Sequence, residues 1–173
     1  MKKFLCILLT ILLLIPLIGC QRHNDSNAFT FYYPRSDFGY DTLEEKFYDE
    51  IIAKEIREDI SPSTTYEIIS IHLKGPIIQD FANPYPENLS LETVVAEGET
   101  LYITVSDHLS YLTGIDLIVA CACLGKTGME LTSTTTVQIS CRKALLDGKK
   151  SIILQNDLII VNDAVSNAAT EQE

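Results

Sequence analysis

Residues 114–124 read GIDLIVACACL, and this stretch decides the fold because it predicts a helix that is apolar on every side. Thr113 and Asp116 have the spacing of a capping box at its start. Gly125 and Gly128 are expected to end it. A helix that is apolar all round is a buried one, and the small side chains of this helix would let it lie close against a sheet.

Strand patterns precede and follow this helix. Residues 91–95 and 101–105 flank Glu97-Gly98-Glu99 and predict a β-hairpin with glycine at its turn. Residues 134–141 are rich in alternating Thr and Val and predict another strand.

The last part of the chain predicts a second hairpin. Asp147-Gly148 is typical of a turn. Residues 151–154 and 158–161 are apolar and predict two strands around Asn156-Asp157.

The N-terminal half predicts a strand, an ambiguous segment and a helix. Residues 28–33 are aromatic and predict a strand that Pro34 closes. Residues 47–57 fit either a helix or a strand, and their period does not decide between them. Thr64 and Glu67 have capping-box spacing at the start of a helix that Gly75-Pro76 ends. Residues 83–86, NPYP, predict a rigid loop.

The order of these elements predicts the fold class. Helices separated by hairpins are typical of an α+β fold. We therefore expect a small mixed or antiparallel sheet with two helices packed on one face.

The first twenty residues predict an exported, lipid-anchored protein. Met1-Lys2-Lys3 is basic and residues 4–18 are almost wholly apolar, as in an export signal. This apolar run is short for a membrane-crossing helix, which needs about 20 residues. Residues 17–20, LIGC, resemble the bacterial lipobox, which implies cleavage before Cys20 and acylation of its thiol. Two acyl chains suffice for stable anchoring.

The expected organisation follows from this signal. We expect a signal peptide over residues 1–19, a flexible tether over 20–28, one domain over 29–161 and a disordered acidic tail over 162–173. The predicted location is the extracytoplasmic face of the cell membrane. The predicted lipid site, Cys20, is the single functional residue that the sequence assigns.

Charge excludes one class of partner. The mature chain would keep 11 of the 13 Lys and Arg residues against 24 Asp and Glu, a net charge of −13. Such a chain repels phosphate backbones, so we expect no nucleic-acid partner. Anionic lipid head groups should repel it too, apart from its anchor.

Three cysteines remain beyond the signal and the lipid site: Cys121, Cys123 and Cys141. An odd number allows at most one disulfide among them, and the sequence does not decide whether Cys141 pairs with Cys121 or Cys123. We expect instead that all three are small buried apolar residues, because no C-x-x-C spacing occurs.

Several short motifs together resemble those of the GerMN domain. They are residues 31–34 (FYYP), 73–76 (LKGP), 83–86 (NPYP), 105–107 (VSD), the helix over 114–129 and residues 137–139 (VQI). The likeness covers residues 29–161. It implies a non-enzymatic extracytoplasmic module of Gram-positive bacteria, similar in fold to the ring-building motifs of secretion machines. Sporulation, germination and envelope assembly are the settings that it implies.

The chain departs from the GerMN pattern in two ways. GerM-type proteins carry two copies of the module and this chain has one, so a sporulation role does not follow directly. His72 stands where an aromatic residue, commonly Tyr, is expected. We expect His72 to be a core histidine that only changes the packing.

Two short motifs contain residue types found in catalytic sites, but neither predicts catalysis. Ser106-Asp107-His108 contains the residue types of a hydrolase triad, but three consecutive residues cannot all converge, and we expect a polar cap that begins the next segment. Gly125-Lys126-Thr127 follows a helix, whereas a P-loop glycine precedes one. We expect no catalytic residue, no metal site and no cofactor.

Two surfaces could still bind a partner. An acidic stretch predicts either a solvated face or a docking surface for a basic partner, and comprises Glu44, Glu45, Asp49, Glu50, Glu55, Glu58 and Asp59. Four tyrosines either form an exposed patch or pack at the sheet edges with wet hydroxyl groups, namely Tyr32, Tyr33, Tyr85 and Tyr102.

The functional expectation is a membrane-anchored interaction module that binds a protein or another envelope component. A small-ligand or cell-wall-glycan binding lipoprotein is the alternative, and it requires a concave pocket with aromatic and polar walls. An envelope hydrolase is a weaker alternative, because it needs convergent polar residues.

Replacing the predicted lipid site tests the anchor. Cys20→Ser should abolish incorporation of radiolabelled palmitate and release the protein from the membrane fraction, because no other residue has the lipobox context. Cys6→Ser is the matched control and should remain labelled and membrane-bound. A Cys20→Ser protein that still takes up palmitate would contradict the assignment.

Overall fold

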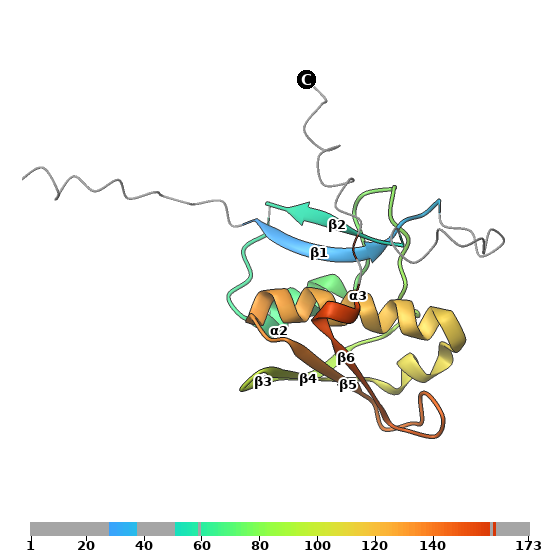
Figure 1. The fold of residues 1–173 in the computed structure, drawn as a ribbon. Coiled ribbons are helices and arrows are strands. Elements are labelled where there is room, and N and C mark those ends of the chain that lie inside the picture. The colour runs from blue at the N-terminus through green and yellow to red at the C-terminus, as the bar shows by residue number, and fades with distance from the viewer. Residues whose placement is uncertain (1–27, 38–50, 59, 160, 162–173) are drawn as a thin grey trace, which may run out of the picture.

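The structure, a computed structural model, describes residues 28–37, 51–58, 60–159 and 161. The predicted signal peptide, Cys20, residues 20–27 of the predicted tether, the acidic residues 44–50 and 59 and the predicted tail lie outside the described residues. The described chain forms three layers: a two-stranded sheet, two helices and a four-stranded sheet (Figure 1). The predicted α+β class is confirmed.

The larger sheet is mixed. Its strands are β3 (Leu91–Glu97), β4 (Thr100–Val105), β5 (Thr136–Ser140) and β6 (Ser151–Gln155), in that order across the sheet. The pairs β3–β4 and β5–β6 are antiparallel, and β4–β5 is parallel. The hairpin predicted around Gly98 is therefore present.

One face of this sheet carries the core. Successive side chains of a strand point to opposite faces, and the inward set is apolar. Its fully buried members are Leu101, Ile103 and Val105 of β4 and Val137 and Ile139 of β5. Helices α2 (Thr65–His72) and α3 (Gly114–Thr132) pack on this face, as predicted.

Helix α3 is longer than the sequence predicts. It runs through Gly125 and Gly128 and ends where Ser133 adopts a left-handed conformation, with φ 55°. The two glycines lie inside the helix because strands pack against them. A Cβ atom at Gly125 would lie 2.7 Å from Val137 Cγ1, and one at Gly128 would lie 2.5 Å from Leu101 Cδ2. Close packing thus outweighs the cost of a helical glycine, about 1 kcal/mol.

The two helix starts differ. At α2 the Thr64 hydroxyl accepts a hydrogen bond from Glu67 N (3.2 Å), and the Glu67 carboxylate accepts one from Ser63 N (2.7 Å). This reciprocal arrangement confirms the predicted cap. At α3 Thr113 is the N-cap residue, but its side chain makes no capping hydrogen bond. The capping box predicted there is wrong.

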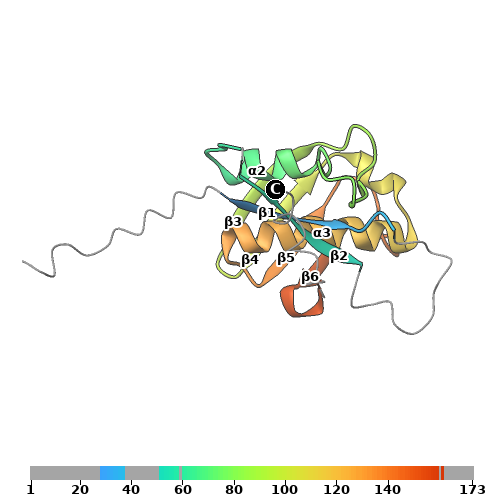
Figure 2. The same ribbon diagram turned by 90° about the horizontal axis from the view of Figure 1, so that it is seen from above.

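The N-terminal strands form a separate sheet. Strand β1 (Phe29–Pro34) pairs antiparallel with β2 (Ile52–Arg57), and Phe29 lies opposite Arg57. The ambiguous segment is therefore a strand where it is described. This small sheet covers the side of α3 that the larger sheet leaves open, as the view from above also shows (Figure 2). The sequence predicted one sheet, and the structure has two.

The second predicted hairpin, at the C-terminal end of the domain, is wrong. Strand β6 pairs with β5 instead of with residues 158–161. After β6 the chain forms a short 3-10 helix, η5 (Asn156–Leu158). Asn156 N donates to Thr135 O (2.9 Å), and Lys126 Nζ of α3 donates to Asn156 Oδ1 (2.7 Å). These contacts hold η5 against α3, and the described residues after β6 form no strand.

Adding a side chain at a helical glycine tests this close packing. Gly128→Val should lower the free energy of unfolding by about 1–3 kcal/mol, since its side chain must displace Leu101 and Ile103 from a filled core. Urea denaturation measures the change. Ile115→Val in the same helix is the control, because Ile115 is exposed. Equal stability of both variants would contradict the close approach.

Candidate functional site

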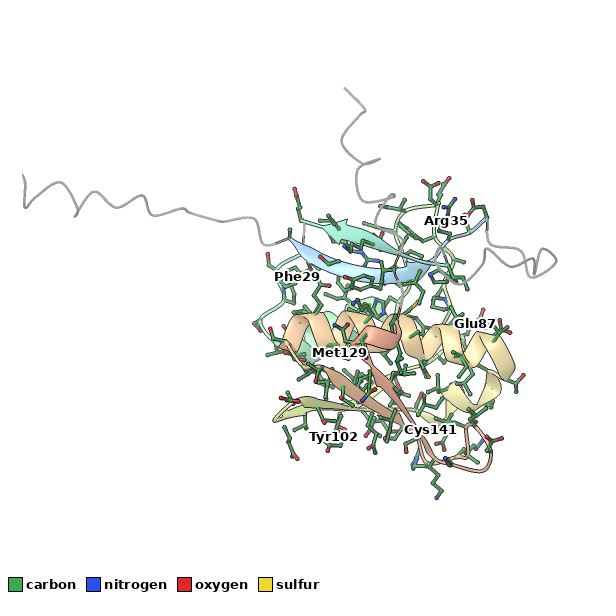
Figure 3. All side chains as sticks on the ribbon, in the orientation of Figure 1. Phe29, Arg35, Glu87, Tyr102, Met129 and Cys141 are labelled. Atoms are coloured by element: carbon green, nitrogen blue, oxygen red, sulfur yellow. The ribbon has the colours of Figure 1, made fainter. Side chains whose placement is uncertain are left out.

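The outer face of the larger sheet is the main candidate for a binding surface. A row of paired residues crosses it: Val95 lies opposite Tyr102, Tyr102 opposite Gln138, and Gln138 opposite Ile153. We call these four residues the open sheet face. No described helix or strand lies beyond them (Figure 1), and Tyr102 points away from the helices in Figure 3.

The open sheet face exposes apolar side chains. Val95 is 48% exposed, Tyr102 39% and Ile153 62%. The flanking rows are polar, and they comprise Thr93, Thr104, Ser140 and Ser151 on one side and Glu97, Thr100, Thr136 and Gln155 on the other. An apolar centre with a polar rim is the composition of a protein–protein contact surface.

Both edges of this sheet are open among the described residues. Strand β3 pairs only with β4, and β6 pairs only with β5. An edge strand presents unpaired backbone groups that can receive a strand from another chain. The face and its edges together form one continuous candidate surface.

Of the two alternatives for the four tyrosines, the exposed patch is wrong for three of them. Tyr32, Tyr33 and Tyr85 are buried, and Tyr102 alone is on the surface. The hydroxyl groups of Tyr33 and Tyr85 find their partners inside the core. The Tyr33 hydroxyl donates to the His72 carbonyl (2.8 Å), and the Tyr85 hydroxyl lies 2.5 Å from His72 Nε2.

A buried ion pair fastens the small sheet to the loop after α2. Arg57 Nη2 donates to Glu55 Oε2 (2.6 Å), and both side chains are buried. Glu55 Oε1 accepts hydrogen bonds from the backbone N–H groups of Ile77 (2.8 Å) and Ile78 (3.0 Å). Arg57 also donates to the Gly75 carbonyl (2.8 Å). For Glu55 the predicted solvated acidic face is therefore wrong, and the residue is structural.

His72 is the predicted core histidine. Its ring is fully buried and stacks on Phe31, with centroids 5.6 Å apart and an interplanar angle of 12°. Burial lowers the pKa of His72 to about 3, and the Arg57 charge acts in the same direction. The ring is neutral at physiological pH. Its Nδ1 atom has no hydrogen-bond partner among the described residues.

The Ser106-Asp107-His108 motif does not assemble a catalytic triad. Ser106 Oγ lies 3.2 Å from His108 Nδ1, but the Asp107 carboxylate accepts from Arg142 N (3.0 Å) and faces the Arg142 side chain. A triad needs the carboxylate on the histidine. The three residues instead lead into the 3-10 helix η4 (Asp107–Tyr111).

The other sequence candidates are also part of the core. Cys121, Cys123 and Cys141 are buried free thiols, as predicted, and burial raises the pKa of Cys121 to about 12. A thiol with so high a pKa is unreactive. Thr127 of the GKT sequence accepts a hydrogen bond from Tyr32 N (3.0 Å) inside the fold.

The structure contains a shallow hollow of about 280 Å³ beside α3. Prolines and loop residues form much of its wall, which includes Pro34, Arg35, Asn83, Pro84, Tyr85, Pro86 and Val119. Tyr85 is almost wholly buried and its hydroxyl group is bonded inside the core. The hollow therefore lacks the exposed aromatic wall that a glycan binder requires.

Comparisons with known proteins leave the resemblance open: no family model, curated protein or solved structure matches the chain. The likeness to GerMN domains therefore stays a prediction. Within the described residues, no helix is long and apolar enough to cross a membrane. The same residues contain no group of three His, Cys, Asp or Glu side chains placed to hold a metal ion.

Acid should destabilise the fold through His72. The unfolded chain binds a proton near pH 6.5, whereas the folded chain does so only near pH 3. The stabilisation is therefore complete above pH 6.5 and declines as the pH falls, by about 1.4 kcal/mol per pH unit. Urea denaturation between pH 7 and 4.5 measures this slope.

His72→Phe is the control for that slope. It should be less stable at pH 7, because the Tyr85 hydroxyl loses its partner, but its stability should depend less on pH over this range. An unchanged slope in His72→Phe would mean that another group causes the acid sensitivity.

Proposed function

We propose that this chain is a lipid-anchored extracytoplasmic lipoprotein whose GerMN-like domain is a non-enzymatic interaction module. Acylated Cys20 would hold the domain at the cell membrane, and the open sheet face would bind a protein partner of the cell envelope. The observation that carries the proposal is the exposure of Val95, Tyr102 and Ile153, which share one row with Gln138 and are covered by no described helix or strand.

The placement of the apolar row supports a protein partner. Val95 and Tyr102 are direct neighbours, and Gln138 separates Tyr102 from Ile153 in the same row. Apolar side chains scattered singly over a surface are ordinary, but exposed apolar side chains gathered in one place with polar rows around them are typical of interaction sites. Here the register of four strands brings the side chains into one row. A flat sheet face fits a protein surface better than a small ligand, which needs a concave site.

The polar clusters support a non-enzymatic role. Glu55 and Arg57 bond to each other and Arg57 also to the backbone, and His72 Nε2 lies against the Tyr85 hydroxyl inside the core. Asp107 is occupied by Arg142. Their geometry gives each group a structural use, and no convergent acid and base remain between them.

Anchoring would strengthen a weak contact. A lipid anchor confines the domain to the membrane surface, and this confinement raises its effective concentration for partners there. The module could then act with modest intrinsic affinity, as suits an envelope component that assembles with others.

Charge on the open sheet face tests the proposal. Ile153→Glu should abolish in-cell cross-linking to envelope partners and reproduce the phenotype of a deletion strain, since a carboxylate would be desolvated in the contact. Ile77→Glu is the matched control, because Ile77 is 72% exposed but lies outside the sheet. It should cross-link and complement like the wild type.

Three results would count against the proposal. One is full complementation by Ile153→Glu together with an unchanged cross-linking pattern. Another is an Ile77→Glu variant that loses cross-linking as fully as Ile153→Glu, because the effect would then not belong to the open sheet face. The third is a deletion strain without any phenotype and without any cross-linked envelope partner.

A further inference from the structure

Basic charge gathers in one loop of this acidic chain. The connection between β5 and β6 contains four basic residues, Arg142, Lys143, Lys149 and Lys150, against one acidic residue, Asp147. We call residues 142–150 the basic hairpin. It projects past the ends of β5 and β6, at the lower right of Figure 1.

The basic hairpin has a defined backbone. Leu145 N donates to Lys149 O (2.7 Å), and Lys149 N donates to Leu146 O (2.9 Å). Between them Asp147 and Gly148 both have positive φ, 51° and 74°, as in a tight hairpin turn. At its base Cys141 N donates to Lys150 O (3.2 Å). The lysines are thus carried on a formed turn.

Three of the four basic side chains form no ion pair with a described acidic residue. Arg142 lies between Glu92 (3.7 Å) and Asp107 (3.6 Å), which neutralise its charge in part. Lys143, Lys149 and Lys150 are exposed and form no ion pair with any described residue. Their charge is available to an anionic partner.

Apolar side chains accompany these lysines. Leu146, next to the turn, is 40% exposed, and Tyr111 of η4 is 65% exposed. Lys143 Nζ lies 5.5 Å from the centroid of the Tyr111 ring, so this ring belongs to the same surface. Lysine beside tyrosine, with an exposed leucine on the same loop, matches a membrane surface, where head groups are charged and the interface favours tyrosine.

We propose that the basic hairpin, together with Tyr111, is a second membrane contact that binds anionic phospholipid head groups. This inference rests on the proposed anchoring through Cys20. The net negative charge of the chain does not prevent the contact, because salt screens exposed charges beyond about 8–10 Å. The lysines at the tip would meet the head groups first.

The contact would orient the domain. Figure 3 shows Phe29, where the described domain begins, and Cys141, at the base of the basic hairpin, at opposite ends of the molecule. The nine residue steps from Cys20 to Phe29 span at most about 30 Å. An anchor on one side of the domain and a lipid contact on the other would fix how the domain is oriented on the membrane.

A fluorescent label in the loop tests the proposal. The full-length lipoprotein is reconstituted in vesicles with Ala144→Cys labelled by an environment-sensitive dye, since the described native thiols are buried. In phosphatidylglycerol-containing vesicles the emission should shift to the blue. Phosphatidylcholine vesicles and high salt should abolish the shift. Glu99→Cys, in the turn between β3 and β4, is the matched label position and should report water throughout.

Charge reversal identifies the residues. Lys143→Glu, Lys149→Glu and Lys150→Glu should each weaken the contact by about fivefold, and the triple variant should show no shift. A blue shift of the emission that persists in the triple variant would overturn the proposal. A blue shift that soluble polyphosphate produces, but anionic vesicles do not, would overturn it in favour of a polymeric anion.

Flotation separates this proposal from the one on which it rests. If the protein floats with both kinds of vesicle while the label at position 144 reports water, it retains its anchor but lacks the lipid contact. This result overturns the present inference alone. Protein that floats with neither kind lacks the Cys20 anchor, and that result overturns both.

Discussion

Burial of helix α3 on both sides is the constraint on which the rest of the structure depends. An ordinary surface helix hides one stripe and shows the other to water. In α3 the buried residues run from Leu117 to Met129 and occupy all sides of the helix. One sheet covers one side only, so the small sheet of β1 and β2 is required to cover the other. The three layers follow from this helix, and no described element covers the outer face of the larger sheet.

The small sheet is held on by polar contacts as well as by packing. Tyr32 bonds to Thr127 of α3 through its backbone, and Arg57 reaches the carbonyl after α2. Burying an ion pair is costly unless every polar atom finds a partner, and here Glu55 accepts from two backbone N–H groups besides Arg57. Such a pair adds little stability over an apolar pair of equal size. Its directional bonds do favour one position of the small sheet over others.

Local signals in the sequence predicted what local interactions decide. The hairpin around Gly98, the Thr64 cap and the Asp147-Gly148 turn each depend on residues a few positions apart, and all are present. One local signal failed, the capping box at Thr113, whose side chain makes no capping hydrogen bond. Other failures involve distant partners. From the sequence alone Gly125 is predicted to end a helix, but in the structure Val137 packs against it inside the helix. Glu55 is predicted to be a surface residue, but Arg57 and the loop after α2 surround it. The open sheet face could not be predicted, because it exists only in the register of four strands.

The buried thiols have a consequence for how the fold can be observed. Cys121 and Cys123 lie on the central helix, between the two sheets, and Cys141 follows β5. A thiol reagent can reach the first two only when a sheet separates from the helix. The rate of their modification therefore reports how often the layers come apart, without any added probe. The folded layers also shield these sulfur atoms from oxidants in the surroundings.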